Sequence, residues 1–266
     1  MSTKIKKLPT QKVIQALDLQ ELICLFYGAP GVGKTTFANE LPKPNLFIAT
    51  EDGQRALEAY VQKVTDWEQF LDVISLLESG DGEKFTSVTI DTVDNLFTFC
   101  EDYVCKKNKI EHMSDAEWGK GWKALEKEFR GAITRLQNTN IGVIFISHAQ
   151  EVEIKRRSLK INKWKPTYGK QVRKIIDPLV DEMFFFFIEE NIDKKTGDAV
   201  QLRKIGCHPA EMYDAKDRMD AFDEVCEMDA SAMSKTFKDA IDSRIKNSSN
   251  HKTKQKPRKV KRKTSK

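Results

Sequence analysis

Long apolar runs are missing from this 266-residue sequence, and cysteine is scarce. The longest wholly apolar runs, such as Met183–Ile188, are far too short to cross a bilayer, and the mean hydropathy of −0.54 agrees with this. No apolar stretch directly follows the basic N-terminal residues, so we expect no secretory signal. The five cysteines are odd in number and scattered, which argues against a disulfide framework. These absences exclude an integral membrane protein and indicate a cytoplasmic location.

Acidic residues are absent from positions 246–266, which hold ten of the 45 lysines and arginines. The preceding residues therefore carry 35 basic and 40 acidic side chains, a net charge of −5. With Val260 as its one large apolar residue, this segment cannot bury enough surface to fold. We expect a disordered basic tail, which either attracts nucleic-acid phosphates or serves only solubility or localisation.

Apolar stretches of strand length recur along the rest of the chain and alternate with helical patterns. Five of them are typical of strands buried on both faces: Leu22–Tyr27, Leu46–Ala49, Ser87–Ile90, Ile141–Ile146 and Glu182–Ile188. Apolar residues spaced three and four apart predict helices over 61–77 and 122–136. This alternation predicts an α/β fold with a mainly parallel central sheet flanked by helices.

Further along, the turn-rich segment 191–198 predicts a β-hairpin between 185–190 and 200–205. A polar helix is expected at about 230–246. We assign residues 1–20 to an N-terminal segment, 21–245 to the folded domain and 246–266 to the tail.

The first buried strand leads into a match to the phosphate-binding pattern G-x-x-x-x-G-K-[ST]. Its glycines allow backbone N–H groups to turn inward on a phosphate, and the helix that follows favours negative charge. The lysine of the pattern would reach the β- and γ-phosphates, and the threonine would bind Mg²⁺. The residues expected to bind ATP are Gly28, Ala29, Pro30, Gly31, Val32, Gly33, Lys34, Thr35 and Thr36.

A second apolar strand ends in Asp91, which is typical of the carboxylate that holds Mg²⁺ through water in such proteins. Ligands of open parallel sheets bind beyond the carboxyl ends of the strands. Thr35, Glu51, Asp91 and His148 all stand at such ends, so we expect them to converge on one γ-phosphate.

Together, Gly28–Thr35, Thr50–Gly53, Val88–Asp91 and Phe145–Gln150 give a specific resemblance. The chain resembles a RecA-like P-loop ATPase, specifically the small phage-encoded proteins that are AAA-type by their P-loop and RecA-like in strand layout. The resemblance covers about residues 22–218. Some members of this group are single-strand annealing recombinases, which implies a role in phage recombination and a location in the host cytoplasm.

The resemblance also implies roles for individual residues. In AAA+ proteins the catalytic glutamate directly follows the aspartate, but here Thr92 does. RecA-like proteins take this base from the end of the preceding strand, where Glu51 stands. His148 occupies the position of the γ-phosphate sensor, which is commonly glutamine, and its neutral imidazole can donate one hydrogen bond.

Lys216 and Arg218 resemble the Lys-x-Arg finger that RecA-like ATPases insert into a neighbour's site. Alternate positions of an extended segment point the same way, so both cations could meet one γ-phosphate. The finger reading implies a homo-oligomer, either a ring or a filament. A solvated charge run is the other interpretation.

Single-stranded DNA would meet the long loop Glu151–Lys170, since RecA-like proteins place DNA-binding loops after the sensor strand. The segment mixes cations with Trp164 and Tyr168, and rings and positive charges suit stacked bases and phosphates. An ordinary basic loop whose tryptophan packs on the body is the alternative.

We therefore expect an ATPase that uses ATP and Mg²⁺ and acts on single-stranded DNA in annealing or strand exchange. A single-strand-binding protein is a further candidate partner, and no membrane is expected. Three alternatives stay open. They are a ring helicase-like translocase, a P-loop small-molecule kinase, and a nucleotide-dependent switch without turnover.

Overall fold

The computed structural model describes residue 8 and residues 17–156, 159–192 and 199–253. Within these residues ten strands form one sheet, whose main path runs in the order β10-β8-β7-β1-β5-β4-β2-β3. The six strands from β7 to β3 along this path are parallel. Their bounds are β7 Glu182–Ile192, β1 Ile23–Gly28, β5 Gly142–Arg156, β4 Ser87–Asp91, β2 Asn45–Ala49 and β3 Tyr60–Lys63. The predicted α/β fold with a mainly parallel central sheet flanked by helices is confirmed.

Antiparallel strands complete the sheet on one side. Strand β8, Ala199–Gly206, pairs with β7 as the predicted C-terminal hairpin, and β10, Val225–Glu227, pairs with β8. Strand β9, Lys216–Asp217, pairs with the beginning of β7, and β6, Leu159–Pro166, pairs with β5.

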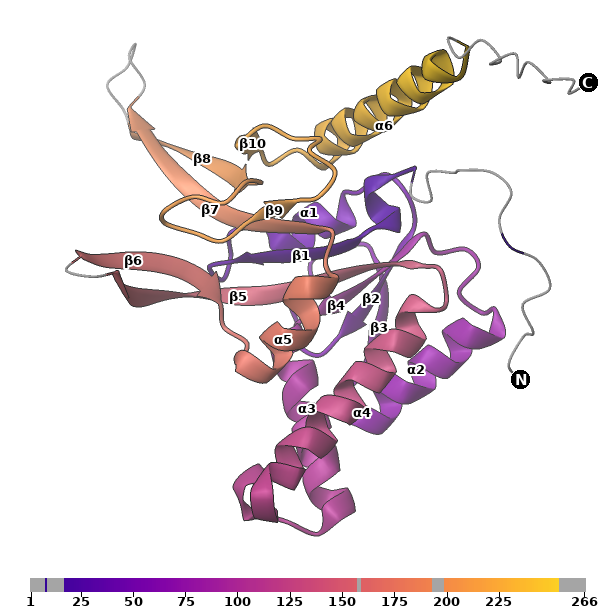
Figure 1. Ribbon diagram of the computed structural model, residues 1–266, viewed down its shortest axis with the longest axis vertical. Coiled ribbons are helices and arrows are strands. Elements are labelled where there is room, and N and C mark those ends of the chain that lie inside the picture. The colour runs from indigo at the N-terminus through magenta and orange to yellow at the C-terminus, as the bar shows by residue number, and fades with distance from the viewer. Residues whose placement is uncertain (1–7, 9–16, 157–158, 193–198, 254–266) are drawn as a thin grey trace, which may run out of the picture.

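Helices cover both faces of the sheet (Figure 1). On one face lie α2 (Trp67–Ser79), α3 (Val93–Asn108), α4 (Lys120–Gln137) and α5 (Lys170–Leu179), and their apolar sides pack with those of the strands into the larger core. On the other face, α1 (Lys34–Asn39) and the first turns of α6 (Ala230–Thr253) pack on Phe26, Phe184 and Phe186. Three 3₁₀ turns complete the set: η1 Leu19–Glu21, η2 Met113–Asp115 and η3 Glu117–Gly119.

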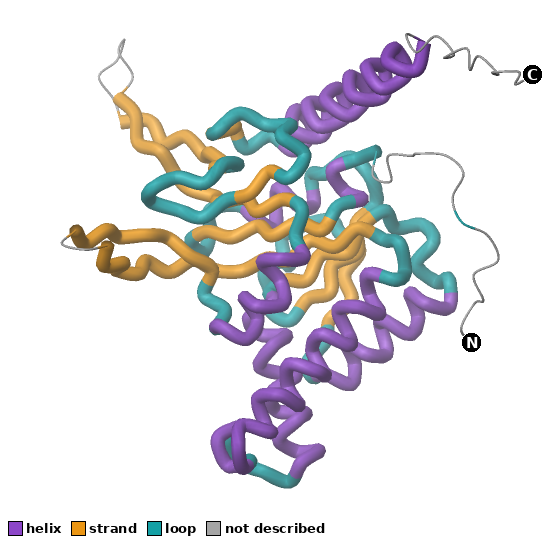
Figure 2. Tube along the Cα trace, viewed as in Figure 1, coloured by secondary structure: helices purple, strands orange, loops and turns teal. Residues whose placement is uncertain are grey.

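The hairpins β5–β6 and β7–β8 extend beyond the helical layers on the same side of the molecule, at the left in Figures 1 and 2. The β5–β6 hairpin, called the ribbon below, corrects the prediction of a long loop over Glu151–Lys170. Its strands pair from Ala149 and Pro166 out to Arg156 and Leu159. The prediction relied on continuous apolar runs, and this segment has none. Its charged residues Glu151, Glu153 and Lys155 alternate with the half-buried Val152 and Ile154, which is the pattern of a strand with one exposed face.

Two other boundaries differ from the predictions. Strand β3 occupies Tyr60–Lys63, and the helix predicted over 61–77 begins only at Trp67, because the Asp66 carboxylate accepts a hydrogen bond from the Gln69 N–H and so caps it. Helix α6 continues to Thr253, seven residues past the predicted end. Residues 254–266 of the predicted tail and most of the predicted segment 1–20 lie outside the described residues. None of the described helices has both the length and the apolar character to cross a membrane.

Candidate active site

The P-loop joins the end of β1 to the start of α1. Gly31 and Gly33 adopt positive φ angles of 75° and 108°, which side chains with a Cβ disfavour, so both glycines are needed for the turn. Gly28 is needed for a different reason, since a Cβ there would lie 2.3 Å from the carbonyl oxygen of Phe186 on β7.

The Lys34 ammonium lies inside this loop. Its Nζ donates hydrogen bonds to the carbonyl oxygens of Gly28 and Ala29, at 2.9 and 3.0 Å, and the residue is 6% exposed. Burial lowers the pKa of Lys34, and the carboxylates of Asp91 and Glu51 act in the opposite direction. The cation is thus held where the loop would receive a phosphate.

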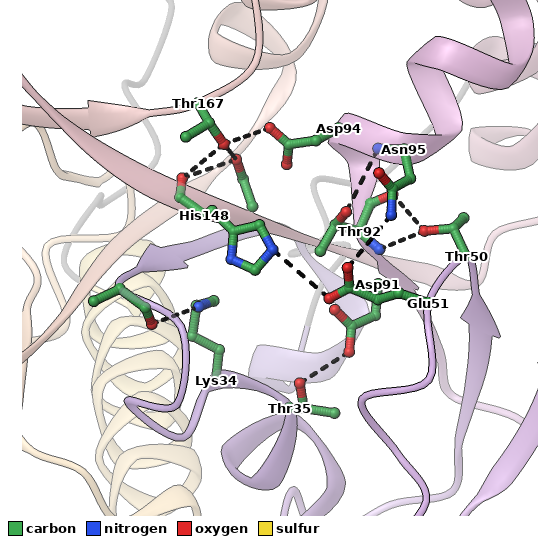
Figure 3. Close-up of polar contacts among 12 residues, drawn as sticks. Lys34, Thr35, Thr50, Glu51, Asp91, Thr92, Asp94, Asn95, His148 and Thr167 are labelled. Atoms are coloured by element: carbon green, nitrogen blue, oxygen red, sulfur yellow. Dashed lines mark hydrogen bonds and ion pairs between the residues drawn. The ribbon is translucent and has the colours of Figure 1, made fainter.

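Asp91 ends β4, two strands away from the P-loop strand, with β5 between them. Thr35 Oγ1 donates to its Oδ2 at 2.9 Å (Figure 3). Gln54 Nε2 donates to the same oxygen at 2.6 Å. Burial raises the pKa of Asp91, and these two hydrogen bonds oppose the shift. The buried carboxylate and the hydroxyl supply the hard oxygen donors that Mg²⁺ prefers.

Glu51 follows β2 and faces the same space. Its Oε1 lies 3.7 Å from His148 Nε2, and its Oε2 accepts a hydrogen bond from Asn95 Nδ2 at 3.3 Å. The side chains of Glu51 and His148 are 35% and 34% exposed, so solvent reaches the gap between them.

The backbone beside Glu51 is fixed to the end of β4. Thr50 N–H donates to the Asp91 carbonyl at 2.9 Å, and Thr92 N–H donates to Thr50 Oγ1 at 2.7 Å. These bonds hold the ends of β2 and β4 in register, which brings the two carboxylates to the same edge of the sheet (Figure 3). Thr35, Glu51, Asp91 and His148, which were expected to converge, lie at this edge together, with Lys34 in the adjoining loop. Their action on one γ-phosphate stays a prediction.

Comparison with known families agrees with this geometry. A family described as AAA domain matches residues 20–219, which is most of the chain. The chain belongs to this AAA domain family. By this family it is a P-loop ATPase.

Among solved structures, this AAA domain is similar to the KaiC-like protein PH0186 from Pyrococcus horikoshii OT3. The identity is 14%, the TM-score is 0.41, and the match covers 71% of this chain and 79% of the other. No curated protein matches the chain.

Residues that sequence reasoning missed also shape the AAA domain's site. Gln54 donates to the Asp91 carboxylate, and Asn95 donates to that of Glu51. Gln54 lies in the irregular segment after β2, and Asn95 lies in the first turn of α3. Their spacing from Asp91 and Glu51 fits no motif, so no sequence signal marked them. Thr167 Oγ1 bonds to Asp94 Oδ1 at 2.5 Å and to the His148 carbonyl at 3.2 Å, which joins α3, β5 and the base of the ribbon.

His148 has one further property that bears on its predicted sensor role. Its Nδ1 is buried and has no hydrogen-bond partner among the described residues, while its Nε2 faces Glu51. The sensor role itself stays a prediction.

Lys216 and Arg218 do not join the P-loop of their own chain. Strand β9 pairs with the first residues of β7, so it lies at the amino edge of the parallel strands, and the P-loop lies at the carboxyl edge. Lys216 Nζ donates to the Val180 carbonyl, and Arg218 Nη1 donates to Asp181 Oδ1 at 2.7 Å. Both cations therefore contact the end of α5, and action in a neighbouring chain stays a prediction.

The two rings of the predicted DNA segment both pack on the body of the domain. Tyr168 is 4% exposed, and its hydroxyl donates to Asp177 Oδ1 at 2.7 Å. Trp164 is half-buried and stacks on Phe185, with ring centroids 6.3 Å apart. It lines a cavity of 390 Å³ beside the P-loop, together with Ala29, Pro30, Val32, Phe185, Phe187, Met212 and Tyr213. The prediction of base stacking was wrong for Tyr168, because that ring is buried. For Trp164, which packs on Phe185 but borders the cavity, it stays a prediction.

Proposed function

We propose that this chain hydrolyses ATP with Mg²⁺ and couples the reaction to single-stranded DNA, in annealing or strand exchange. One observation carries the proposal of hydrolysis. Lys34, the Thr35–Asp91 pair and Glu51 meet at one edge of the sheet, although they come from three different strand ends.

Each group has a chemical task in this reaction. Lys34 binds the β- and γ-phosphates, and Thr35 and Asp91 hold Mg²⁺, which neutralises phosphate charge when bound. Glu51 orients the attacking water and accepts its proton. Asn95 donates to one oxygen of Glu51 at 3.3 Å, so it fixes the carboxylate and leaves the other oxygen toward His148.

A path from this site to DNA supports the second half of the proposal. Strand β5 is continuous from Gly142 to Arg156, so it carries His148 at the site and then becomes one side of the ribbon. Exposed Lys155 lies toward the ribbon's far end, where it suits a phosphate backbone. Lys160 is paired with Glu153, and Lys163 and Lys165 are paired with Asp214, whereas Lys155 forms no ion pair with a described residue.

The test is ATP hydrolysis by the full chain with and without single-stranded DNA. We expect DNA to stimulate the rate, Lys34→Ala to abolish ATP binding, and Glu51→Gln to retain binding while hydrolysis falls at least about 100-fold. Asp52→Asn is the matched control, because Asp52 is the exposed neighbour of Glu51 and pairs only with surface cations, Arg55 and Lys63.

The outcomes separate the two halves of the proposal. A Glu51→Gln protein that hydrolyses ATP at the wild-type rate would refute the assignment of the base. Hydrolysis that is indifferent to DNA would refute the coupling, and a screen of phosphate acceptors would then test the kinase alternative.

A further inference from the structure

Arg203 lies beside the P-loop, although no motif marks it. Across β1 and β7, Gly28 is paired with Phe186, and across β7 and β8, Ile188 is paired with Arg203. Measured along β7, Arg203 therefore lies two residue positions farther toward the carboxyl edge of the sheet than Gly28, the first glycine of the loop. The nucleotide site lies at this edge.

The Arg203 side chain reaches the loop itself. A Cβ atom placed on Gly33 would lie 3.4 Å from Arg203 Nη1 and 2.8 Å from Met228 Cε. The Met228 N–H donates to the Arg203 carbonyl at 3.2 Å, which ties β8 to the segment after β10. The guanidinium thus stands beside the residue that precedes Lys34.

The charge of Arg203 is not matched by the protein around it. Its side chain is exposed, and it forms no ion pair or hydrogen bond with any described residue. The adjacent Lys204, by contrast, pairs with Glu227 and lies 4.0 Å from Glu189. An unpaired guanidinium next to a phosphate-binding loop is suited to bidentate hydrogen bonds with phosphate oxygens.

The sheet order indicates which phosphates these are. Strand β8 lies on one side of β1, and β5, β4 and β2, which carry His148, Asp91 and Glu51, lie on the other. Arg203 therefore approaches the loop from the side away from the groups expected at the γ-phosphate.

We propose that Arg203 binds the α- and β-phosphates of the nucleotide within the same chain. This inference rests on the proposed binding of ATP. ATP and ADP both have these phosphates, so such a contact stabilises the complex of the protein with either nucleotide equally. It therefore changes the affinity for nucleotide more than the rate at which bound ATP is hydrolysed.

The test is calorimetric titration of the full chain with ATP and with ADP, together with steady-state hydrolysis. We expect Arg203→Ala to weaken both affinities at least about ten-fold, and to raise KM by far more than it lowers kcat. Arg203→Lys should recover part of the affinity. Arg130→Ala is the control, because Arg130 is an exposed arginine on α4 whose partner is Glu126.

The other outcomes overturn the proposal in distinguishable ways. Unchanged affinities would show that Arg203 does not touch the nucleotide, and a loss confined to ATP or to kcat would place it at the γ-phosphate instead. A lowered melting temperature without nucleotide, with no rescue by lysine, would make its role structural. If wild type and Lys34→Ala fail equally to bind ATP, the proposed function falls and this inference falls with it.

Discussion

Glu182 is fully buried at the start of β7, on the opposite edge of the sheet from the nucleotide site. Its carboxyl lies near that of Asp217, which is also buried. Burial, and after it the neighbouring charge of Asp217, raise the pKa of Glu182 to about 9. Glu182 is therefore protonated in the folded protein at neutral pH.

This shift predicts a pH dependence of stability. In the unfolded chain Glu182 titrates near 4.5, so between pH 4.5 and 9 the folded state binds the extra proton, and stability falls as pH rises through that range. Glu182→Gln has no such proton to lose. We expect wild type to lose more stability than Glu182→Gln between pH 6 and pH 9, by at most about 4 kcal/mol.

Denaturant unfolding at the two pH values measures this difference. Glu189→Gln serves as the control, because Glu189 lies on the same strand and its side chain is 48% exposed. Parallel pH profiles for wild type and Glu182→Gln would contradict the prediction.

At the scale of single residues, the sequence indicated where a site residue lies when a motif fixes its type. Lys34, Thr35, Asp91 and Glu51 stand at strand ends, and strand ends of a parallel sheet share an edge, so their meeting followed from their positions. Gln54, Asn95 and Arg203 reach the site because of the path of a loop, a helix turn and a hairpin register, and none of these can be derived from spacing.

At the scale of elements, the base of the ribbon is the junction between the nucleotide site and the proposed DNA surface. Thr167 bonds to Asp94 and to the carbonyl of His148 there. Removing its hydroxyl breaks the link between α3 and the ribbon. We expect Thr167→Val to lower DNA-stimulated hydrolysis several-fold more than hydrolysis without DNA.

The same ATPase assay with and without single-stranded DNA measures this effect. Thr98→Val is the control, because its hydroxyl bonds to the Asp94 carbonyl on the exposed side of the same helix. Equal losses with and without DNA would show that Thr167 supports the site rather than the coupling.

The elements that were predicted correctly are those that bury a continuous or periodic apolar surface. All five buried strands and the helix at α4 have such patterns. Strand β3 is exposed along its whole length and the ribbon is mostly polar, so neither contains the continuous apolar run by which the buried strands were recognised.

At the scale of the whole molecule, the two candidate parts of a shared site lie at opposite edges of the sheet. Lys216 and Arg218 are at the amino edge, and the P-loop is at the carboxyl edge. A head-to-tail arrangement of copies would bring the amino edge of one chain to the carboxyl edge of its neighbour. Arg218→Ala should then lower kcat about 1,000-fold.

Mixing variants tests whether Arg218 acts on the neighbour. Arg218→Ala and Lys34→Ala chains are each expected to be inactive, and their mixture should regain hydrolysis, because some interfaces combine an intact P-loop with an intact Arg218. A mixture that stays inactive, or an Arg218→Ala protein with wild-type activity, would contradict a trans role. Equal melting temperatures of the variants would exclude a simple loss of the Arg218–Asp181 contact as the cause.

The length of β5 has a mechanical consequence. From His148 to Arg156 the strand extends about 26 Å, at about 3.3 Å per residue, and it is paired with β6 from Ala149 onward. As a stiff lever pivoting at His148, it would convert a tilt of about 5° into a displacement of about 2 Å at its far end. A small tilt at the nucleotide site would thus become a displacement at the far end of the ribbon that is large enough to make or break a hydrogen bond there.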